Sequence, residues 1–118
     1  MKTKKLLTLF ALMSAASVIA QTPPVYSALE AAKHVGETAT VTDRVDGFHQ
    51  SGKGNIFLNM GGKYANQAFT AFIPSASAGQ FPQPQQYEGR TVAVSGKITL
   101  YRGKPEIIVN SPSQISAR

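Results

Sequence analysis

The clearest pattern in the chain is an alternation of apolar and polar residues between Gly89 and Ile115. The apolar members share even-numbered positions and are Val92, Val94, Ile98 and Leu100. This two-residue period is typical of a half-buried strand, so we expect all four to point inward. A polar turn at 101–104, with Gly103 free to take a positive φ, leads to a second strand at 106–109. Asn110, Ser111 and Pro112 then end that strand, because proline cannot donate to a ladder. The C-terminal third therefore predicts a β-hairpin.

Three earlier strands follow from the same pattern. We predict one at 37–48, bent near Asp43, a second at 55–60, and a third at 67–73 that Pro74 ends. The glycine-rich segment 47–55 is expected to form a loop between the first two. Segment 75–87 is rich in Ser, Ala, Pro and Gln, and it predicts an irregular connection with a short helix at most.

The segment before these strands predicts a short helix. Ser27 and Glu30 have the spacing of a capping box, in which each side chain accepts from the other residue's backbone amide. Alanine and leucine follow, and Gly36 stands where a left-handed cap ends a helix of two or three turns. Residues 21–26, with two consecutive prolines, are expected to be a flexible lead-in.

Residues 1–20 have the layout of a secretory signal peptide. Three lysines precede an apolar run from Leu6 to Ile19, and we expect cleavage after Ala20, with Ala16 as a second choice. The run has about 14 residues, fewer than the roughly 17 to 25 that a membrane-spanning helix needs. The expected location is therefore the periplasm or the exterior of the cell, with no membrane span after cleavage.

Removal of this segment changes the charge. The full chain carries a net charge of +6, with twelve Lys and Arg against six Asp and Glu. Three of the lysines lie in the signal segment, so nine basic residues remain and the net charge falls to +3. That value is far below the density of a polybasic protein. The chain has no cysteine, which excludes disulfides, a lipid-bearing cysteine, a thiolate metal site and a Cys nucleophile.

Five strands with the long connection between the third and the fourth match the strand order of the OB-fold. We therefore predict an all-β protein: a five-stranded OB-fold Greek-key barrel with a short N-terminal capping helix, in a single domain over residues 27–116. The segments that carry a family resemblance are Gly54–Asn59, Gln67–Ala71, Tyr87–Arg90, Tyr101–Ile107 and Pro112–Ile115. They resemble the small exported bacterial OB-fold proteins and the nucleic-acid-binding class of OB domains. The resemblance covers residues 27–115 and implies a nucleic-acid-binding type of OB domain.

Candidate catalytic residues are sparse. His34 and His49 have no companions at metal-ligand spacing, and the six carboxylates are scattered. No serine lies in a Gly-x-Ser-x-Gly turn, and Gly52-Lys53-Gly54 lacks the spacing of a phosphate loop. We expect no enzymatic activity, no metal and no cofactor.

The most informative functional pattern is an interleaving of aromatic and basic residues. OB-folds bind ligands across the second and third strands and the loops beside them. The candidate nucleic-acid-binding residues at those positions are Phe48, Lys53, Asn55, Phe57, Asn59, Lys63, Tyr64, Phe72, Tyr101, Arg102 and Lys104. His49, Asn66 and Thr70 lie in the same strands and loops. Aromatic rings stack on bases and basic groups neutralise phosphates. In the alternative interpretation, Phe57 or Phe72 belongs to a second small core and Tyr101 only covers the hairpin.

These patterns predict a monomeric, non-enzymatic envelope module that binds single-stranded DNA or RNA weakly and without sequence preference. The alternative is a periplasmic module that binds an envelope protein or a small ligand and has no nucleic-acid role. Salt separates the two, because only phosphate contacts release counterions and so make the affinity fall steeply as salt rises.

Overall fold

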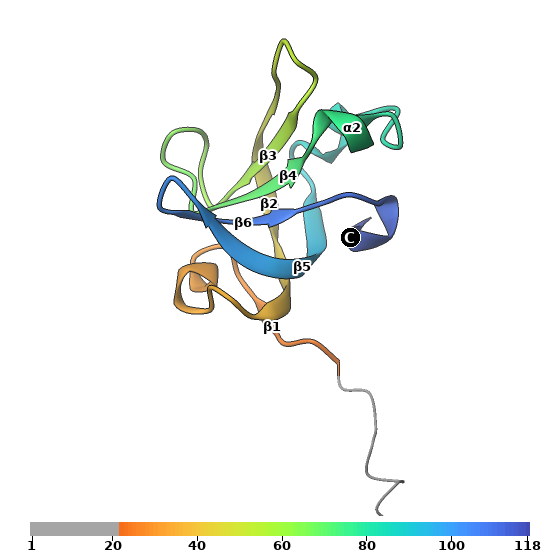
Figure 1. Ribbon diagram of the computed structural model, residues 1–118. Helices are drawn as coiled ribbons and strands as arrows, with labels where there is room; N and C mark the ends of the chain where they lie inside the picture. Colours follow the sequence, from red (N-terminus) through yellow and green to blue (C-terminus); the bar gives the residue numbers. More distant parts are fainter. Residues whose placement is uncertain (1–21) are drawn as a thin grey trace, which may run out of the picture.

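The computed structural model describes residues 22–118 (Figure 1). The predicted signal peptide and its cleavage site lie outside these residues. No helix within them is long and apolar enough to cross a membrane.

The described part of the chain forms seven strands, which hydrogen-bond in the order β1-β2-β3-β4-β6-β5-β7. Their bounds are β1 Val25–Tyr26, β2 Thr38–Gln50, β3 Ile56–Met60, β4 Phe69–Ile73, β5 Thr91–Tyr101, β6 Lys104–Ile108 and β7 Ile115–Ala117. Four short helices connect them: η2 Glu30–Lys33, α2 Ser75–Ala78, η3 Pro84–Tyr87 and η4 Pro112–Gln114.

Strand β2 closes part of the sheet into a ring because it pairs with two partners. Residues 38–44 pair antiparallel with β5, and residues 45–50 pair antiparallel with β3. The circuit continues from β3 to β4, then through a parallel pairing to β6, and back to β5. The result is a barrel-like, mostly β fold, with β1 and β7 added beside β2 and β5.

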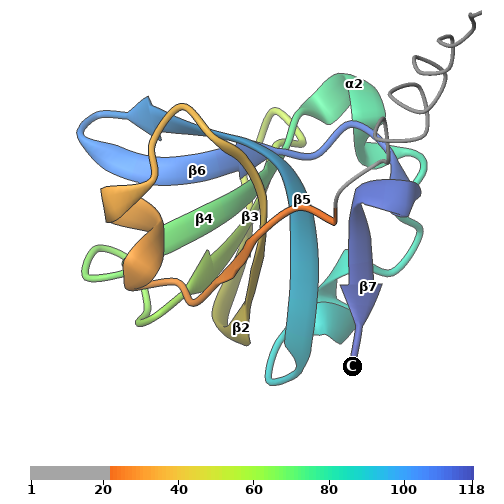
Figure 2. The same cartoon turned by 90° about the horizontal axis from the view of Figure 1, so that it is seen from below.

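Strand β5 bends because it pairs with two different strands of the ring. Its residues 91–97 pair with β2 and its residues 98–101 pair with β6. The change of partner falls between Lys97 and Ile98, next to Gly96, whose φ is +154°. A Cβ at this position would lie 2.7 Å from the Cγ2 atom of Ile107, so only glycine lets the two strands approach this closely. Figure 2 shows β5 curving along its length, with β7 beside its first half.

The core lies inside the ring and consists of the inward-facing residues of its strands. Its largest fully buried side chains are Phe69, Ile56, Leu58, Met60, Ile73, Ile98, Ile107, Val41, Val45, Val92, Val94 and Val109. The predicted inward positions of Val92, Val94 and Ile98 are thus confirmed. Leu100 was expected inward as well, but that expectation was wrong, because its side chain is 55% exposed. It pairs with Pro105 next to the hairpin turn, beyond Ile98, which is the last core residue of β5.

Two parts of the predicted architecture need correction. The sheet has seven strands rather than five, because β1 and β7, at the two ends of the described chain, join it. Val25 and Tyr26 lie in the expected lead-in, and they pair in parallel with Thr40 and Val41. The predicted loop at 47–55 is shorter than expected, because β2 runs to Gln50.

The predicted capping helix is absent from the described structure. The capping box itself forms, since the Ser27 amide donates to Glu30 Oε1 at 2.8 Å and the Glu30 amide donates to Ser27 Oγ at 3.2 Å. Only the single 3-10 turn η2 follows it. The chain then leaves the helical path at Gly36, with φ +97°, and the Gly36 amide donates to the carbonyl of Ile98 at 2.8 Å. This bond leads the chain directly into β2.

The register of the hairpin makes a stability prediction. Ile98→Ala should lower the free energy of unfolding by about 2–5 kcal/mol, because it removes buried methylenes and leaves a cavity. Leu100→Ala is the matched control on the same strand and should change the free energy by less than about 0.5 kcal/mol, as an exposed site does. Urea unfolding of the two variants measures the difference. Equal costs at both positions would contradict the register described here.

Candidate functional site

Two rows of side chains cross the outer face of the ring. The first is mostly aromatic: His49 of β2 is paired with Phe57 of β3, which is paired with Phe72 of β4. The ring centroids of His49 and Phe57 are 5.8 Å apart, and those of Phe57 and Phe72 are 5.2 Å apart. These separations are within the range of favourable aromatic contacts. The row therefore presents a continuous apolar surface across three strands.

The second row is polar and lies one step along the strands. Asn59 of β3 is paired with Thr70 of β4, which is paired with Glu106 of β6. The Thr70 hydroxyl donates to the Asn59 side-chain oxygen at 2.9 Å, and both residues are buried. Burial raises the pKa of the Glu106 carboxyl above its ordinary value. A sheet face with buried polar groups is costly to form unless something satisfies them.

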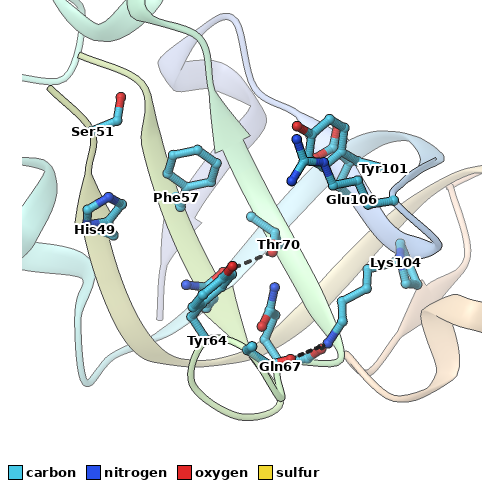
Figure 3. A pocket seen from close by; sticks show the side chains of 13 residues that line it. His49, Ser51, Phe57, Tyr64, Gln67, Thr70, Tyr101, Lys104 and Glu106 are labelled. Carbon is cyan, nitrogen blue, oxygen red and sulfur yellow. Dashed lines mark hydrogen bonds between the residues drawn. The ribbon is translucent and has the colours of Figure 1, made fainter. Parts of the chain in front are cut away.

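A pocket of about 650 Å³ lies over both rows (Figure 3). Its floor is formed by the strands β3, β4 and β6, and its sides by segment 61–68 and the turn of the β5–β6 hairpin. The residues that line it are His49, Ser51, Phe57, Asn59, Tyr64, Ala65, Gln67, Thr70, Tyr101, Arg102, Lys104, Pro105 and Glu106. The pocket size is in the range of sites that hold small molecules or single nucleotides.

Lys104 ties the two sides of the pocket together. Its ammonium donates to the carbonyl of Ala65 at 2.6 Å and to the carbonyl of Gln67 at 3.0 Å. Neither acceptor is charged, so the positive charge stays uncompensated at this point. Tyr64, in the same segment, is 82% exposed and lies at the rim.

The hairpin turn supplies the other rim. Arg102, with φ +51°, and Gly103, with φ +81°, take the left-handed conformations of a tight hairpin turn. The Arg102 guanidinium lies 5.1 Å from the centroid of the Tyr101 ring, a cation–π contact. Both side chains are exposed, so an aromatic face and a cation stand together at the mouth of the pocket.

The structure brings together six of the predicted binding residues in this pocket: Phe57, Asn59, Tyr64, Tyr101, Arg102 and Lys104. His49 and Thr70 join them. Two more, Asn55 and Phe72, line a smaller pocket of about 140 Å³ that also contacts Phe57, Tyr101 and Glu106. The amide oxygen of Asn55 accepts from the backbone amide of Ser75 at 2.8 Å and so is already engaged.

Four of the predicted residues do not line either of these pockets. Phe48 packs against the core and is half-buried. Lys53 is exposed at the tip of the β2–β3 connection, and Lys63 lies beside Gly47. Asn66 is exposed, and its backbone carbonyl lies beside Gly62.

Sequence reasoning missed Glu106 and Gln67. Glu106 begins the predicted second strand of the hairpin, but only the pairing of β6 with β4 shows that it faces the same side as Thr70. Gln67 precedes β4 and is only 8% exposed, and its side-chain oxygen has no hydrogen-bond partner within the described structure. No local pattern in the sequence marks either residue.

Three of the other acidic residues make hydrogen bonds away from the pocket. Asp43 accepts from the backbone amide of Ala28 at 2.9 Å, and Asp46 accepts from that of Gly62 at 2.7 Å. Glu37 accepts from the Tyr26 hydroxyl at 2.7 Å and contacts His34 Nδ1 at 2.8 Å. Among residues 22–118, no three His, Cys, Asp or Glu side chains gather in a group that could hold a metal ion.

Comparison with known proteins gives a fold and no family. No known family model matches the sequence, and no curated protein sequence does either. Among the solved structures that share the fold are two aspartyl-tRNA synthetases. An aspartyl-tRNA synthetase of Leishmania major matches with a TM-score of 0.54 and 14% identity over 86% of this chain and 22% of its own. The aspartyl-tRNA synthetase of Entamoeba histolytica matches with a TM-score of 0.53 and 17% identity over 85% of this chain and 27% of its own.

The present chain thus spans about a quarter of the length of either synthetase. At this identity the likeness concerns the fold alone. It supports an OB-fold domain, in agreement with the all-β, barrel-like prediction from the sequence.

The carboxyl group of Glu106 makes a prediction about pH. Because burial raises its pKa in the folded state, the group favours folding when protonated, and this contribution is lost as the pH rises through that pKa. Glu106→Gln does not titrate, so the stability of the variant relative to the original protein should increase between about pH 3.5 and pH 7. Urea unfolding at both pH values measures this change.

Glu37→Gln is the control, because its effect on stability should change with pH in the opposite direction. Hydrogen bonds from Tyr26 and then His34 lower the pKa of Glu37, so its contribution to stability is present above the ordinary pKa and is lost on acidification. The free energy of unfolding of Glu37→Gln, relative to that of the original protein, should therefore be lower at about pH 7 than at about pH 3.5. Parallel pH trends for the two variants would show that Glu106 is not held in the partly desolvated position described.

Proposed function

We propose that this protein is a non-enzymatic binding module of the cell envelope whose pocket face binds single-stranded nucleic acid weakly. The observation that carries the proposal is the pocket over the aromatic and polar rows, with aromatic rings and cations together at its rim. Binding in this arrangement depends mainly on stacking and on phosphate neutralisation, both of which are largely independent of sequence.

The exposure of the aromatic side chains supports a stacking role. Phe57 is only half-buried, and Tyr64 and Tyr101 are 82% and 54% exposed. An exposed ring normally costs free energy through its contact with water, and a base stacked on it removes that surface from solvent. The rings lie on three different elements around one pocket, so they can contact successive bases or two faces of the same base.

The positions of the basic side chains support contacts with a phosphate backbone. Arg102 and Lys104 line the pocket, and Lys53 stands on the β2–β3 connection. Within residues 22–118 none of the three forms an ion pair with a carboxylate. Their charges are therefore available to an anion. With a net charge of only +3 after removal of the predicted signal segment, a weak complex is expected.

Two further considerations support the proposal. Two of the solved structures that share the fold are aspartyl-tRNA synthetases, proteins named for an RNA substrate. The envelope location rests on the basic and then apolar N-terminal pattern of residues 1–20. The non-enzymatic assignment rests on the scattered histidines and carboxylates and on the missing nucleophile motifs.

One observation favours a second candidate function. The pocket volume of about 650 Å³ also suits a small envelope ligand. In that case the affinity for the small ligand would depend little on salt, and an oligonucleotide would not displace that ligand from the pocket.

Salt dependence tests the phosphate contacts. Affinity for an oligothymidylate of about twelve nucleotides should fall log-linearly with salt, and Arg102→Gln should reduce the slope by about one. Lys97→Gln, which removes an exposed charge on β5 outside the pocket, is the matched control and should leave the slope unchanged. Fluorescence anisotropy titrations at several salt concentrations measure both. No detectable binding at about 50 mM salt would refute the nucleic-acid proposal.

Replacement of one ring tests stacking separately. Tyr64→Ala should weaken the same complex by about 1–3 kcal/mol without altering the salt slope, because stacking involves no counterion release. Tyr64 is largely exposed, so its loss should not affect folding. Tyr64→Phe keeps the ring and should bind like the original protein. An affinity that falls equally in both variants would exclude a stacking role for this ring.

A further inference from the structure

The pocket combines features that a simple phosphate site would not have. Its rim carries the cations Arg102 and Lys104, yet Glu106, the only carboxylate that lines it in the described structure, lies over β6 beside Thr70. A carboxylate next to a phosphate would repel it. The pocket is therefore divided into a rim that attracts anions and a floor that attracts hydrogen-bond donors.

The floor also contains amide groups with hydrogen-bonding capacity to spare. Asn59 uses its oxygen to accept from Thr70, which leaves its NH₂ group for another acceptor. Gln67 is 8% exposed, and its side-chain oxygen has no partner in the described residues. Figure 3 shows the Gln67 amide extending into the pocket between Thr70 and Lys104. The atom without a partner is an acceptor, so it would gain from a ligand donor, whereas the NH₂ group of the same amide carries the donors that a ligand acceptor needs.

The polar groups of the floor form one row. Asn59, Thr70 and Glu106 are direct neighbours on three adjacent strands, and adjacent strands are about 4.8 Å apart. The row therefore extends over about 10 Å, with a carboxylate at one end and an amide at the other. Phe57, in the row beside it, supplies an apolar surface next to this polar edge.

We propose that the floor of the pocket selects one guanine base of the bound strand, with the Glu106 carboxylate accepting from its N1–H and N2–H₂ groups and a side-chain amide of Gln67 or Asn59 donating to its O6. The inference rests on the proposed function, and it makes one position an exception to sequence-independent binding. A nucleotide satisfies both parts of the pocket at once, since its phosphates meet the cations at the rim and its base meets the floor.

Guanine fits this floor better than the other bases because of its edge. It presents two adjacent donors, which match the two oxygens of a carboxylate, followed by an acceptor, which matches an amide NH₂. Adenine and cytosine present one donor next to an acceptor, and thymine and uracil present one donor between two acceptors. Each of these would place an acceptor against the Glu106 carboxylate or leave one of its oxygens without a donor.

The experiment compares oligothymidylates of about twelve nucleotides that carry one guanine, inosine, adenine or cytosine at a central position. In anisotropy titrations, the guanine strand should bind about five- to twentyfold more tightly than the unsubstituted strand, as one bidentate contact to a base can provide. Inosine, which lacks the 2-amino group, should lose most of the gain. Glu106→Gln should abolish the guanine preference, so that the guanine strand and the unsubstituted strand bind this variant with the same affinity.

Glu88→Gln is the matched control, because Glu88 is an exposed carboxylate that lines neither pocket, and this variant should keep the preference. Free guanosine monophosphate should displace the labelled guanine strand only at a much higher concentration than an unlabelled guanine strand does. Equal potency would overturn the inference that the guanine is bound as part of a strand. Binding of all strands with equal affinity would overturn the inference and leave the proposed function intact. Absence of binding to every strand would instead refute the proposed function.

Discussion

The shared pairing of β2 is the constraint on which the rest of the structure depends. One strand of thirteen residues hydrogen-bonds to β5 along its first half and to β3 along its second, and this closes the ring. Closure requires β5 to change partners as well, and the bend at Gly96 allows it, because any larger residue there would collide with Ile107. The closed ring then places β3, β4 and β6 side by side, and this places Asn59, Thr70 and Glu106 in one row.

Burial of side chains is favourable on one face of these strands and costly on the other. On the inner face, Ile56, Leu58 and Met60 alternate with the outward residues of β3 and are fully buried, so the hydrophobic effect favours the arrangement directly. On the outer face, Asn59 and Thr70 are also buried although they are polar. Their mutual hydrogen bond offsets part of the cost of desolvation, and Gln67 retains an oxygen without a partner. Stability alone would favour smaller or apolar residues on this face, and this observation supports the binding role that we propose for it.

The sequence predicted those features that depend on local patterns. Alternation placed Val92, Val94 and Ile98 in the core, and the Ser27–Glu30 spacing predicted a capping box that forms without its helix. The strands β1 and β7 have two and three residues, too few for a period to be seen. The parallel pairing of β4 with β6 joins residues more than thirty positions apart, and no local pattern encodes it. For that reason Glu106 was not predicted, whereas the aromatic residues of the pocket were predicted because they lie where OB-folds bind ligands. Gln67 was missed because no local pattern shows that its side chain is buried with an oxygen that lacks a partner.

The pocket is held open by contacts between its two sides rather than by the strands alone. Segment 61–68 and the hairpin turn are both connections, and connections in general are more mobile than the strands they join. The ammonium of Lys104 bonds to two carbonyls of that segment, so the rim residue Tyr64 and the floor residue Gln67 are positioned from the hairpin. Tyr64 and Gln67 therefore lose conformational freedom when the protein folds and not when a ligand binds. Because the binding free energy is then not reduced by ordering these residues, a ligand that makes few contacts can bind more tightly. A module with a modest charge and a small binding face depends on such preorganisation more than a polybasic protein would.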